Sequence, residues 1–155
     1  MQNPDPLSPQ SLAGLGLQLG LVSQLYGGLM TRMLERHDLT YPQFTLLMHL
    51  SRRSEPSRVS DLAAAVDLTQ SAVTKVIQKF TRMGLVDVLR DTADQRNRPV
   101  RVTPAGIARV IEVQRGFGPV FQSMLDGWTP DEVGRLTADL ARITRWLDGA
   151  RRPDQ

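Results

Sequence analysis

The most regular pattern of apolar and polar positions lies between Thr69 and Gly84. Apolar side chains recur there every three or four residues, which predicts one stripe of an α-helix; they are Val73, Val76, Ile77, Phe80 and Met83. Thr69 stands where an N-cap is expected, and Gly84 stands where the chain should turn out of the helix. The opposite side carries hydroxyl, amide and lysine side chains and no carboxylate. The pattern therefore predicts a helix with an apolar back and a front that does not repel phosphate.

Two helices are expected near the amino end. Leu12–Leu34 is dense in Leu and Met at helical spacing, and its apolar residues cover more of the helix than one neighbour could bury. A partner subunit is the simplest explanation of that surface. Thr40 as N-cap and Pro42 in a first turn then open a second helix, which is expected to end near Ser51.

A short helix is expected just before the polar-fronted one. Val59 is a candidate for a short strand, and Ser60 is expected to cap a helix over Asp61–Val66. Asp67 and Leu68 are then left to form the turn into Thr69. A helix, a tight turn and a second helix with a polar front have the spacing of a helix-turn-helix.

The period changes to that of β-strands after Gly84. Leu85–Arg90 consists mostly of β-forming residues, and Val100–Thr103 alternates between apolar and polar side chains. The segment Asp91–Pro99 between them is too polar to be buried and too long for a two-residue turn. Two strands with a charged tip after a helix-turn-helix are expected to form a wing.

The tip of this hairpin carries candidate DNA contacts. Arg96 and Arg98 could enter a narrow, electronegative minor groove, and Asp94 could hold Arg96 in position by a charge-assisted hydrogen bond. An ordinary exposed hairpin could have the same composition, so this interpretation depends on the helix that precedes it.

Two further helices are expected in the last third of the chain. Thr103 and Pro104 supply an N-cap and a first helical position, and Gly116–Pro119 should kink or interrupt the helix that they open. Thr129 and Glu132 are placed for the capping box of the final helix. The fold class is therefore mainly α with a small β-hairpin wing.

The composition narrows the class of protein. At 155 residues and 41% hydrophobic residues, the chain fits one domain or one domain with extensions. Cysteine is absent, which excludes disulfides and a thiol nucleophile. No stretch approaches the roughly 20 apolar residues of a membrane span, and the amino end does not read as a signal peptide. We therefore expect a cytoplasmic protein without a membrane partner.

The positive charge is concentrated in the middle of the chain. The formal net charge is only +3, but residues 51–102 hold ten Lys or Arg against six Asp or Glu, whereas the remainder holds nine against ten. Lys75 and Lys79, both on the polar-fronted helix, are the only lysines. A local basic field favours a polyanion as partner. Short polar side chains followed by cations suit a helix that reads base edges in a major groove. An uneven solvated surface is the alternative.

The sequence contains no motif typical of an enzyme and few residues that could bind a metal ion. No nucleophile with its base, paired acid or phosphate-binding glycine loop is present, so we expect no enzyme and no cofactor. His37 and His49 are the only histidines, and no metal site is expected, although Glu35, His37 and Asp38 leave a weak alternative. An effector cavity could be lined by Tyr26, Met30, Met33, Met48 and Trp146, but stripes of this kind more often belong to a core. The candidates for a ligand pocket are Tyr26, Met30, His37 and Met48.

The order of expected elements resembles the MarR family of bacterial and archaeal transcription regulators over residues 12–149. The most specific part is DQRNRPVRVTPAG, Asp94–Gly106, which is similar to the wing signature of that family, with Val102 where Leu is more usual. LTYPQFTLLMHL and VSDLAAAVDLTQSAVTKVIQKFTRMGLV also match the corresponding family patterns.

The resemblance implies a homodimer with one winged helix-turn-helix per subunit. Residues 12–36 and 104–149 would form the helical dimerisation region and residues 40–103 the DNA-binding lobe, between a frayed start at 1–11 and a tail at 150–155. Two such lobes would enter successive major grooves about 34 Å apart on an inverted-repeat operator. Relatives are mostly repressors released by a small aromatic or anionic effector.

The resemblance also assigns roles to residues by position. Thr69, Gln70, Ser71, Thr74 and Lys75 would lie at bases and nearby phosphates, Arg96 and Arg98 with Asp94 at the minor groove, and Arg52, Arg53 and Lys79 at the DNA backbone. The alternative function is a winged-helix adaptor that binds proteins without binding DNA.

Overall fold

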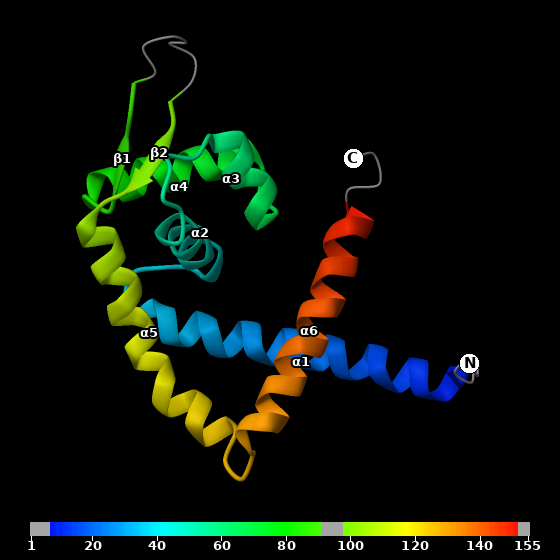
Figure 1. The fold of residues 1–155 in the computed structure, drawn as a ribbon. Coiled ribbons are helices and arrows are strands. Elements are labelled where there is room, and N and C mark those ends of the chain that lie inside the picture. The colour runs from blue at the N-terminus through cyan, green and yellow to red at the C-terminus, as the bar shows by residue number, and fades with distance from the viewer. Residues whose placement is uncertain (1–6, 91–97, 152–155) are drawn as a thin grey trace. The chain divides into compact units, whose positions relative to one another are not determined.

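The computed structural model describes residues 7–90 and 98–151 (Figure 1). Within them the elements follow in the order α1 (Pro9–Glu35), α2 (Tyr41–Ser51), α3 (Val59–Val66), α4 (Gln70–Arg82), β1 (Val86–Val88), β2 (Val100–Val102), α5 (Pro104–Met124) and α6 (Pro130–Arg151). The expected class, helices with one β-hairpin, is confirmed. The chain divides into two compact units, residues 1–117 and 118–155, and the boundary falls inside α5.

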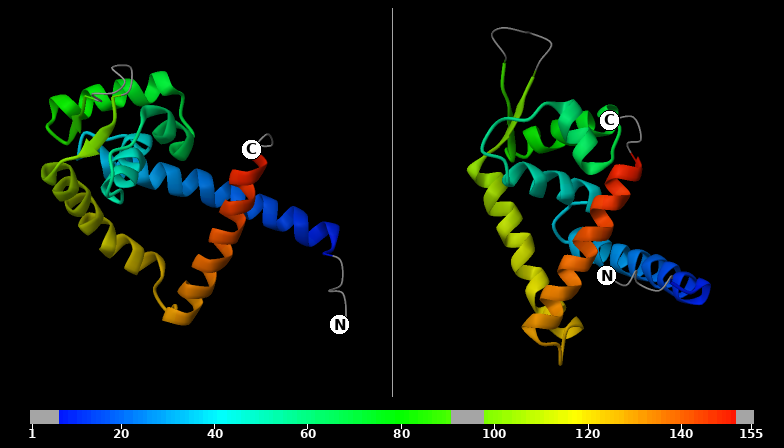
Figure 2. Two further views of the ribbon diagram at one scale, coloured as in Figure 1. Left: turned by 45° about the horizontal axis from the view of Figure 1, so that its top comes forward. Right: turned by 45° about the vertical axis from the view of Figure 1, so that its right-hand side comes forward.

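The core of the first unit is formed by α2, α3, α4 and the hairpin, together with the end of α1 and the first half of α5. Contacts join α2 to α3 and β2, α3 to α4, and α4 to β1; the arrangement can be followed in Figures 1 and 2. The side chains buried there are fully or almost fully enclosed; they include Leu46, Leu47, Leu50, Leu62, Val73, Phe80, Val86 and Val100. Each contributes on the order of 1.5–3 kcal/mol on leaving water, so these short elements are stabilised chiefly by packing.

The connection from α3 to α4 is a tight turn. Asp67 takes φ 55°, a left-handed conformation that Asp tolerates better than most residues. The N–H of Leu68 donates to the carbonyl oxygen of Ala63 over 3.1 Å, which closes the end of α3. Thr69 then caps α4, because its Oγ1 accepts from the N–H of Ala72 over 3.2 Å. The helix-turn-helix and the N-cap at Thr69 are therefore confirmed.

The predicted start of α3 was wrong. Val59 lies in the helix and not in a strand, and the N-cap is Arg58 and not Ser60. The extended backbone lies at Ser57 instead, which exchanges hydrogen bonds of 2.9 and 2.8 Å with Val100. The β-propensity of Val59 misled because tertiary contacts decide such short segments. Arg58 makes no side-chain capping hydrogen bond, so the first N–H groups of α3 have no side-chain cap.

The hairpin pairs β1 and β2 in antiparallel register. Val86 faces Val102 and Val88 faces Val100, and the N–H of Leu89 extends the ladder to the carbonyl oxygen of Pro99 over 2.8 Å. Gly84 precedes β1 with φ 70°, where a residue without Cβ is favoured. The strands and the glycine turn out of α4 are confirmed.

A kink or an interruption of α5 is expected at Gly116–Pro119, and of these two the interruption is wrong. The helix continues through Gly116–Pro119 with Pro119 inside it. A proline in a helix removes one N–H and clashes with the preceding turn, but it does not always end the helix. The start is as expected, because Thr103 Oγ1 accepts from the N–H of Gly106 over 3.1 Å.

The remaining helix ends follow their capping signals. Thr40 and Gln43 form a capping box at α2, and Thr129 and Glu132 form one at α6. Hydrogen bonds from Thr129 to the exposed carboxylate lower the pKa of Glu132. Helix α1 begins at Pro9, three residues before the expected Leu12, and α6 continues to Arg151, into the expected tail. No helix among the described residues is long and apolar enough to span a membrane.

Candidate nucleic-acid interface

Helix α4 presents a polar front and an apolar back, as the sequence predicted. Val73, Ile77 and Phe80 are buried. Gln70, Ser71, Thr74 and Lys75 are exposed, within the first two turns of the helix. The exposed positions offer amide, hydroxyl and ammonium groups, which are the side-chain types that hydrogen-bond to base edges and phosphates.

The hydroxyls of Thr69 and Thr74 are already hydrogen-bonded to the backbone. Thr69 Oγ1 accepts from Ala72, and Thr74 Oγ1 donates to the carbonyl oxygen of Gln70 over 2.8 Å. Thr74 therefore has its hydroxyl hydrogen occupied and retains an acceptor and a methyl group toward solvent. Gln70, Ser71, Lys75 and Gln78 are exposed polar donors of the front.

A pocket of about 490 Å³ lies between the start of α3, helix α4 and the hairpin. Its lining comprises Arg58, Val59, Ser60, Gln70, Thr74, Ile77, Gln78, Val88, Arg98 and Val100. Two arginines stand on its rim, and no carboxylate is among the residues that line it. The N-terminus of α3, which has no side-chain cap, lies at the same surface, and the carboxylate of Asp61 in its first turn partly offsets the positive charge of the helix end. The concave surface is therefore suited to an anion such as a phosphate of a nucleic-acid backbone.

The sequence prediction missed three residues of this surface. Arg58, Ser60 and Gln78 line the pocket beside the predicted Gln70, Thr74 and Arg98. The sequence pattern predicts Ser60 only as a helix cap, and it does not place Gln78 or Arg58 among the expected DNA contacts. A cation directly before a helix without a capping side chain was the signal that could have identified Arg58.

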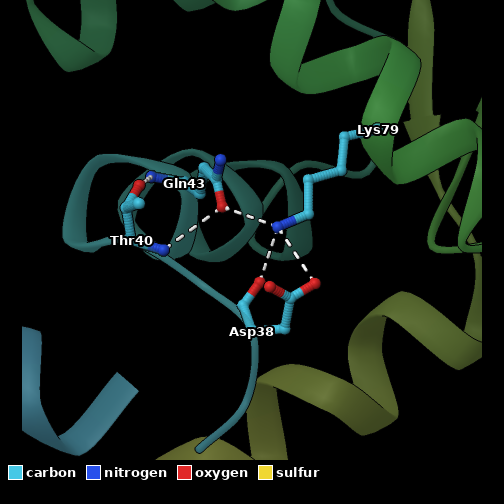
Figure 3. A network of polar contacts seen from close by, with 4 residues as sticks. All are labelled: Asp38, Thr40, Gln43 and Lys79. Atoms are coloured by element: carbon cyan, nitrogen blue, oxygen red, sulfur yellow. Dashed lines mark hydrogen bonds and ion pairs between the residues drawn. The ribbon is translucent and has the colours of Figure 1, made fainter. Parts of the chain in front are cut away.

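Lys79 points away from the exposed front of α4. Its Nζ donates to the carbonyl oxygen of Asp38 over 2.6 Å and to Gln43 Oε1 over 3.3 Å, and it lies 3.3 Å from Asp38 Oδ2 (Figure 3). The predicted contact of Lys79 with the DNA backbone is not tested by these bonds, but they give its ammonium three acceptors inside the protein.

Arg52 and Arg53 are exposed at the end of α2. The guanidinium of Arg53 approaches His49 Nε2, with Nε at 3.3 Å and Nη2 at 3.2 Å. Partial burial lowers the pKa of His49, and the charges of Arg53 and Arg52 lower it further. Asp94 and Arg96, the other predicted wing residues, lie outside the described residues.

The four predicted effector residues have partners within the protein. Tyr26 meets Tyr41 edge to face with ring centroids 6.1 Å apart, and burial raises its pKa. Met30 is 2% exposed and belongs to the core. His37 Nδ1 lies 3.8 Å from Glu112 Oε1, and Met48 Sδ accepts from Gln114 Nε2 over 3.8 Å. Their role in ligand binding stays a prediction.

A metal centre has no candidate in the part of the chain that is described. No group of three or more His, Asp or Glu side chains there is arranged to hold an ion. The surface formed by α3, α4 and the base of the hairpin is therefore the candidate functional site that we consider.

The chain matches a protein-family model and a curated relative. The family model described as MarR family matches residues 37–97. The HTH-type transcriptional repressor IacR of Pseudomonas putida is 30% identical over 119 residues, which are 77% of this chain and 71% of that protein.

Two solved structures share the fold. A MarR protein from Peptoclostridium difficile is 18% identical with a TM-score of 0.73, over 97% of this chain and 94% of that one. A mutant of E. coli MarR complexed with operator DNA is 24% identical with a TM-score of 0.68, over 85% of this chain and 94% of that one. The sequence match to IacR, the family model and this shared architecture lead to one conclusion: the chain belongs to the MarR family.

Proposed function

We propose that this protein is a transcriptional regulator that binds an inverted-repeat DNA operator as a homodimer. The observation that carries the proposal is the continuous surface of α4 and the pocket beside it, where exposed donors and two arginines occur without a carboxylate. Membership of a family whose relatives are named transcriptional regulators supports the same function.

The first turns of α4 would enter the major groove. Gln70 can pair with adenine through its amide, Ser71 can donate or accept, and the Thr74 methyl can contact a thymine methyl. Arg58 and Arg98 on the pocket rim would contact flanking phosphates, and Arg96 would reach the minor groove. Phosphate contacts fix the register, and the α4 side chains supply the sequence preference.

The apolar surfaces of α1 and α6 support a homodimer. On α1, Leu15 is 50% and Leu25 is 70% exposed, and on α6, Trp146 is 72% and Leu147 is 55% exposed. Large exposed apolar side chains that recur along a helix mark an interaction surface. We propose that these helices pair with those of a second copy, which would hold two α4 helices about one DNA turn apart.

The regulation we propose is repression relieved by a small aromatic or anionic effector. The relative IacR is named a repressor. An effector that binds better to one spacing of the two lobes would shift the dimer away from the spacing that fits DNA. Tyr26, Met30, His37 and Met48 are the residues we propose for that site.

Binding to random-sequence duplex DNA tests the proposal against the adaptor alternative. If about six phosphates are neutralised, affinity should fall on the order of 10³-fold between about 50 and about 200 mM salt. Arg98→Ala should weaken binding, whereas Arg135→Ala, which removes the same charge from α6, should not. No detectable binding by the parent protein at low salt would favour the adaptor.

A further inference from the structure

The ammonium group of Lys79 meets three oxygen acceptors at once. They are the carbonyl oxygen of Asp38 at 2.6 Å, Asp38 Oδ2 at 3.3 Å and Gln43 Oε1 at 3.3 Å (Figure 3). A lysine ammonium has three N–H donors on one atom, so a single nitrogen can make both hydrogen bonds and the ion pair. A guanidinium spreads its donors over a plane and cannot direct three from one nitrogen. Lys75 is the only other lysine in the chain. Position 79 therefore carries one of two lysines, and its contacts all come from a single nitrogen, which an arginine could not reproduce.

The acceptors are held by two fixed helix ends. At the end of α1, the N–H of Leu39 donates to the carbonyl oxygen of Leu34, and the N–H of Asp38 donates to that of Glu35. These are the two hydrogen bonds of a Schellman motif, with Asp38 in the left-handed position at φ 53°.

At the start of α2, Gln43 Oε1 also accepts from the N–H of Thr40 over 3.2 Å, and Thr40 Oγ1 accepts from the N–H of Gln43. Asp38 and Gln43 are each restrained by these backbone hydrogen bonds. A shift of α4 would therefore lengthen their hydrogen bonds to Lys79.

The same connection also contacts α5. His37 Nδ1 lies 3.8 Å from Glu112 Oε1, and Arg109 Nη1 lies 3.6 Å from Glu112 Oε2. The residues between α1 and α2 thus meet α5 through His37 and α4 through Asp38.

The ion pair between Lys79 and the Asp38 carboxylate contributes little to holding α4 against the α1–α2 connection. The Asp38 side chain is 84% exposed, so its attraction for Lys79 is largely screened by water. The Lys79 side chain is 26% exposed, and its remaining acceptors are a carbonyl and an amide, which keep their positions whether or not the carboxylate is present. The carbonyl of Asp38 and the amide of Gln43 are therefore the main partners.

We propose that Lys79 is a positioning residue that fixes the orientation of helix α4 against the α1–α2 connection, and is not a contact to the DNA backbone. The proposal replaces the role expected for Lys79 from the sequence, and its consequence for DNA rests on the proposed function. Fixing α4 should matter for sequence preference, because base contacts need a defined helix orientation, whereas phosphate attraction does not.

The test compares Lys79→Met with Lys75→Met, which removes the same charge one turn earlier on the same helix. Methionine keeps an unbranched apolar stem, so packing is retained. Affinity for a selected operator and for random duplex of equal length is measured between about 50 and about 200 mM salt. Asp38→Asn, which retains the carbonyl and tolerates the left-handed backbone, serves as a second variant.

For Lys79→Met we expect operator affinity to fall about tenfold, as for loss of one hydrogen bond to a charged group. Affinity for random duplex and the slope of log affinity against log salt should stay unchanged. For Lys75→Met the slope should decrease by about one unit for each subunit, because a phosphate contact is lost. Asp38→Asn should change operator affinity less than about twofold. If Lys79→Met decreases the slope as Lys75→Met does, or leaves operator affinity unchanged, the proposal is overturned.

Hydrogen exchange of the DNA-free protein separates this proposal from the proposed function. Backbone amides of α4 and of residues 38–43 should exchange faster in Lys79→Met than in the parent and in Lys75→Met. Unchanged exchange would overturn the positioning role whatever the DNA result. If α4 exchanges faster in Lys79→Met but the parent protein binds no DNA, the positioning role of Lys79 is supported and the proposed function is refuted.

Discussion

Gly106 lies against the carbonyl oxygen of Leu85, so closely that a Cβ at position 106 would overlap that oxygen and crowd a methyl group of Val102. This contact joins the start of α5 to Leu85, the residue immediately before β1. Gly106→Ala should destabilise the protein by about 1–3 kcal/mol, the usual cost of forcing an added carbon into a packed site. Chemical denaturation of the parent and the variant measures the difference.

Gly134→Ala is the matched control for this glycine. A Cβ at position 134 meets nothing within 4 Å, and the residue lies inside α6. Alanine there should stabilise by up to about 1 kcal/mol, since glycine is the poorer helix former. Equal effects of the two substitutions would mean that the close approach of Gly106 to Leu85 is not what requires glycine.

Arg58→Ser should raise the free energy of unfolding and lower the affinity for DNA. Serine at the N-cap can accept from an N–H of the first turn of α3, which Arg58 does not do, so unfolding should cost about 1 kcal/mol more. The same change removes a cation from the rim of the pocket, so affinity for duplex DNA should decrease. Thermal unfolding and fluorescence anisotropy on the same preparation measure both. A variant that binds DNA as tightly as the parent would exclude Arg58 from the interface.

His49 should make stability depend on pH near neutrality. Its folded pKa lies below the ordinary 6.5 because of partial burial and the nearby arginines. As pH falls below about 6.5, the unfolded chain takes up a proton before the folded one does, so the free energy of unfolding decreases.

A glutamine at position 49 retains an acceptor for Arg53 but does not titrate. Parent and His49→Gln should therefore differ in how steeply stability falls between about pH 7 and about pH 5.5, with the parent falling more steeply. Parallel profiles would show that His49 does not contribute.

The sequence could predict α4 because its determinants are local. The cap at Thr69, the buried stripe and the turn at Gly84 all lie within one short stretch. The direction of Lys79 could not be predicted, because its acceptors Asp38 and Gln43 are 41 and 36 positions away along the chain. Only the fold brings them together.

The errors at Val59 and Pro119 have a similar origin. Residue propensity favoured a strand at Val59 and a kink or break at Pro119, but Val59 lies in α3 and α5 continues through Pro119. The sequence predicted some residues of the pocket beside α4 but not the pocket itself. Arg58 and Arg98 come from separate elements, and only the fold brings them to one surface.

Selection of DNA fragments by the purified full-length protein tests the central claim most directly. The account predicts enrichment of one sequence with two inverted half-sites whose centres are about 10 base pairs apart. Exchanging Gln70 for Ala should relax the preference at a single position in each half-site. Recovery of no enriched sequence, or of a lone half-site without its inverted copy, would contradict the account.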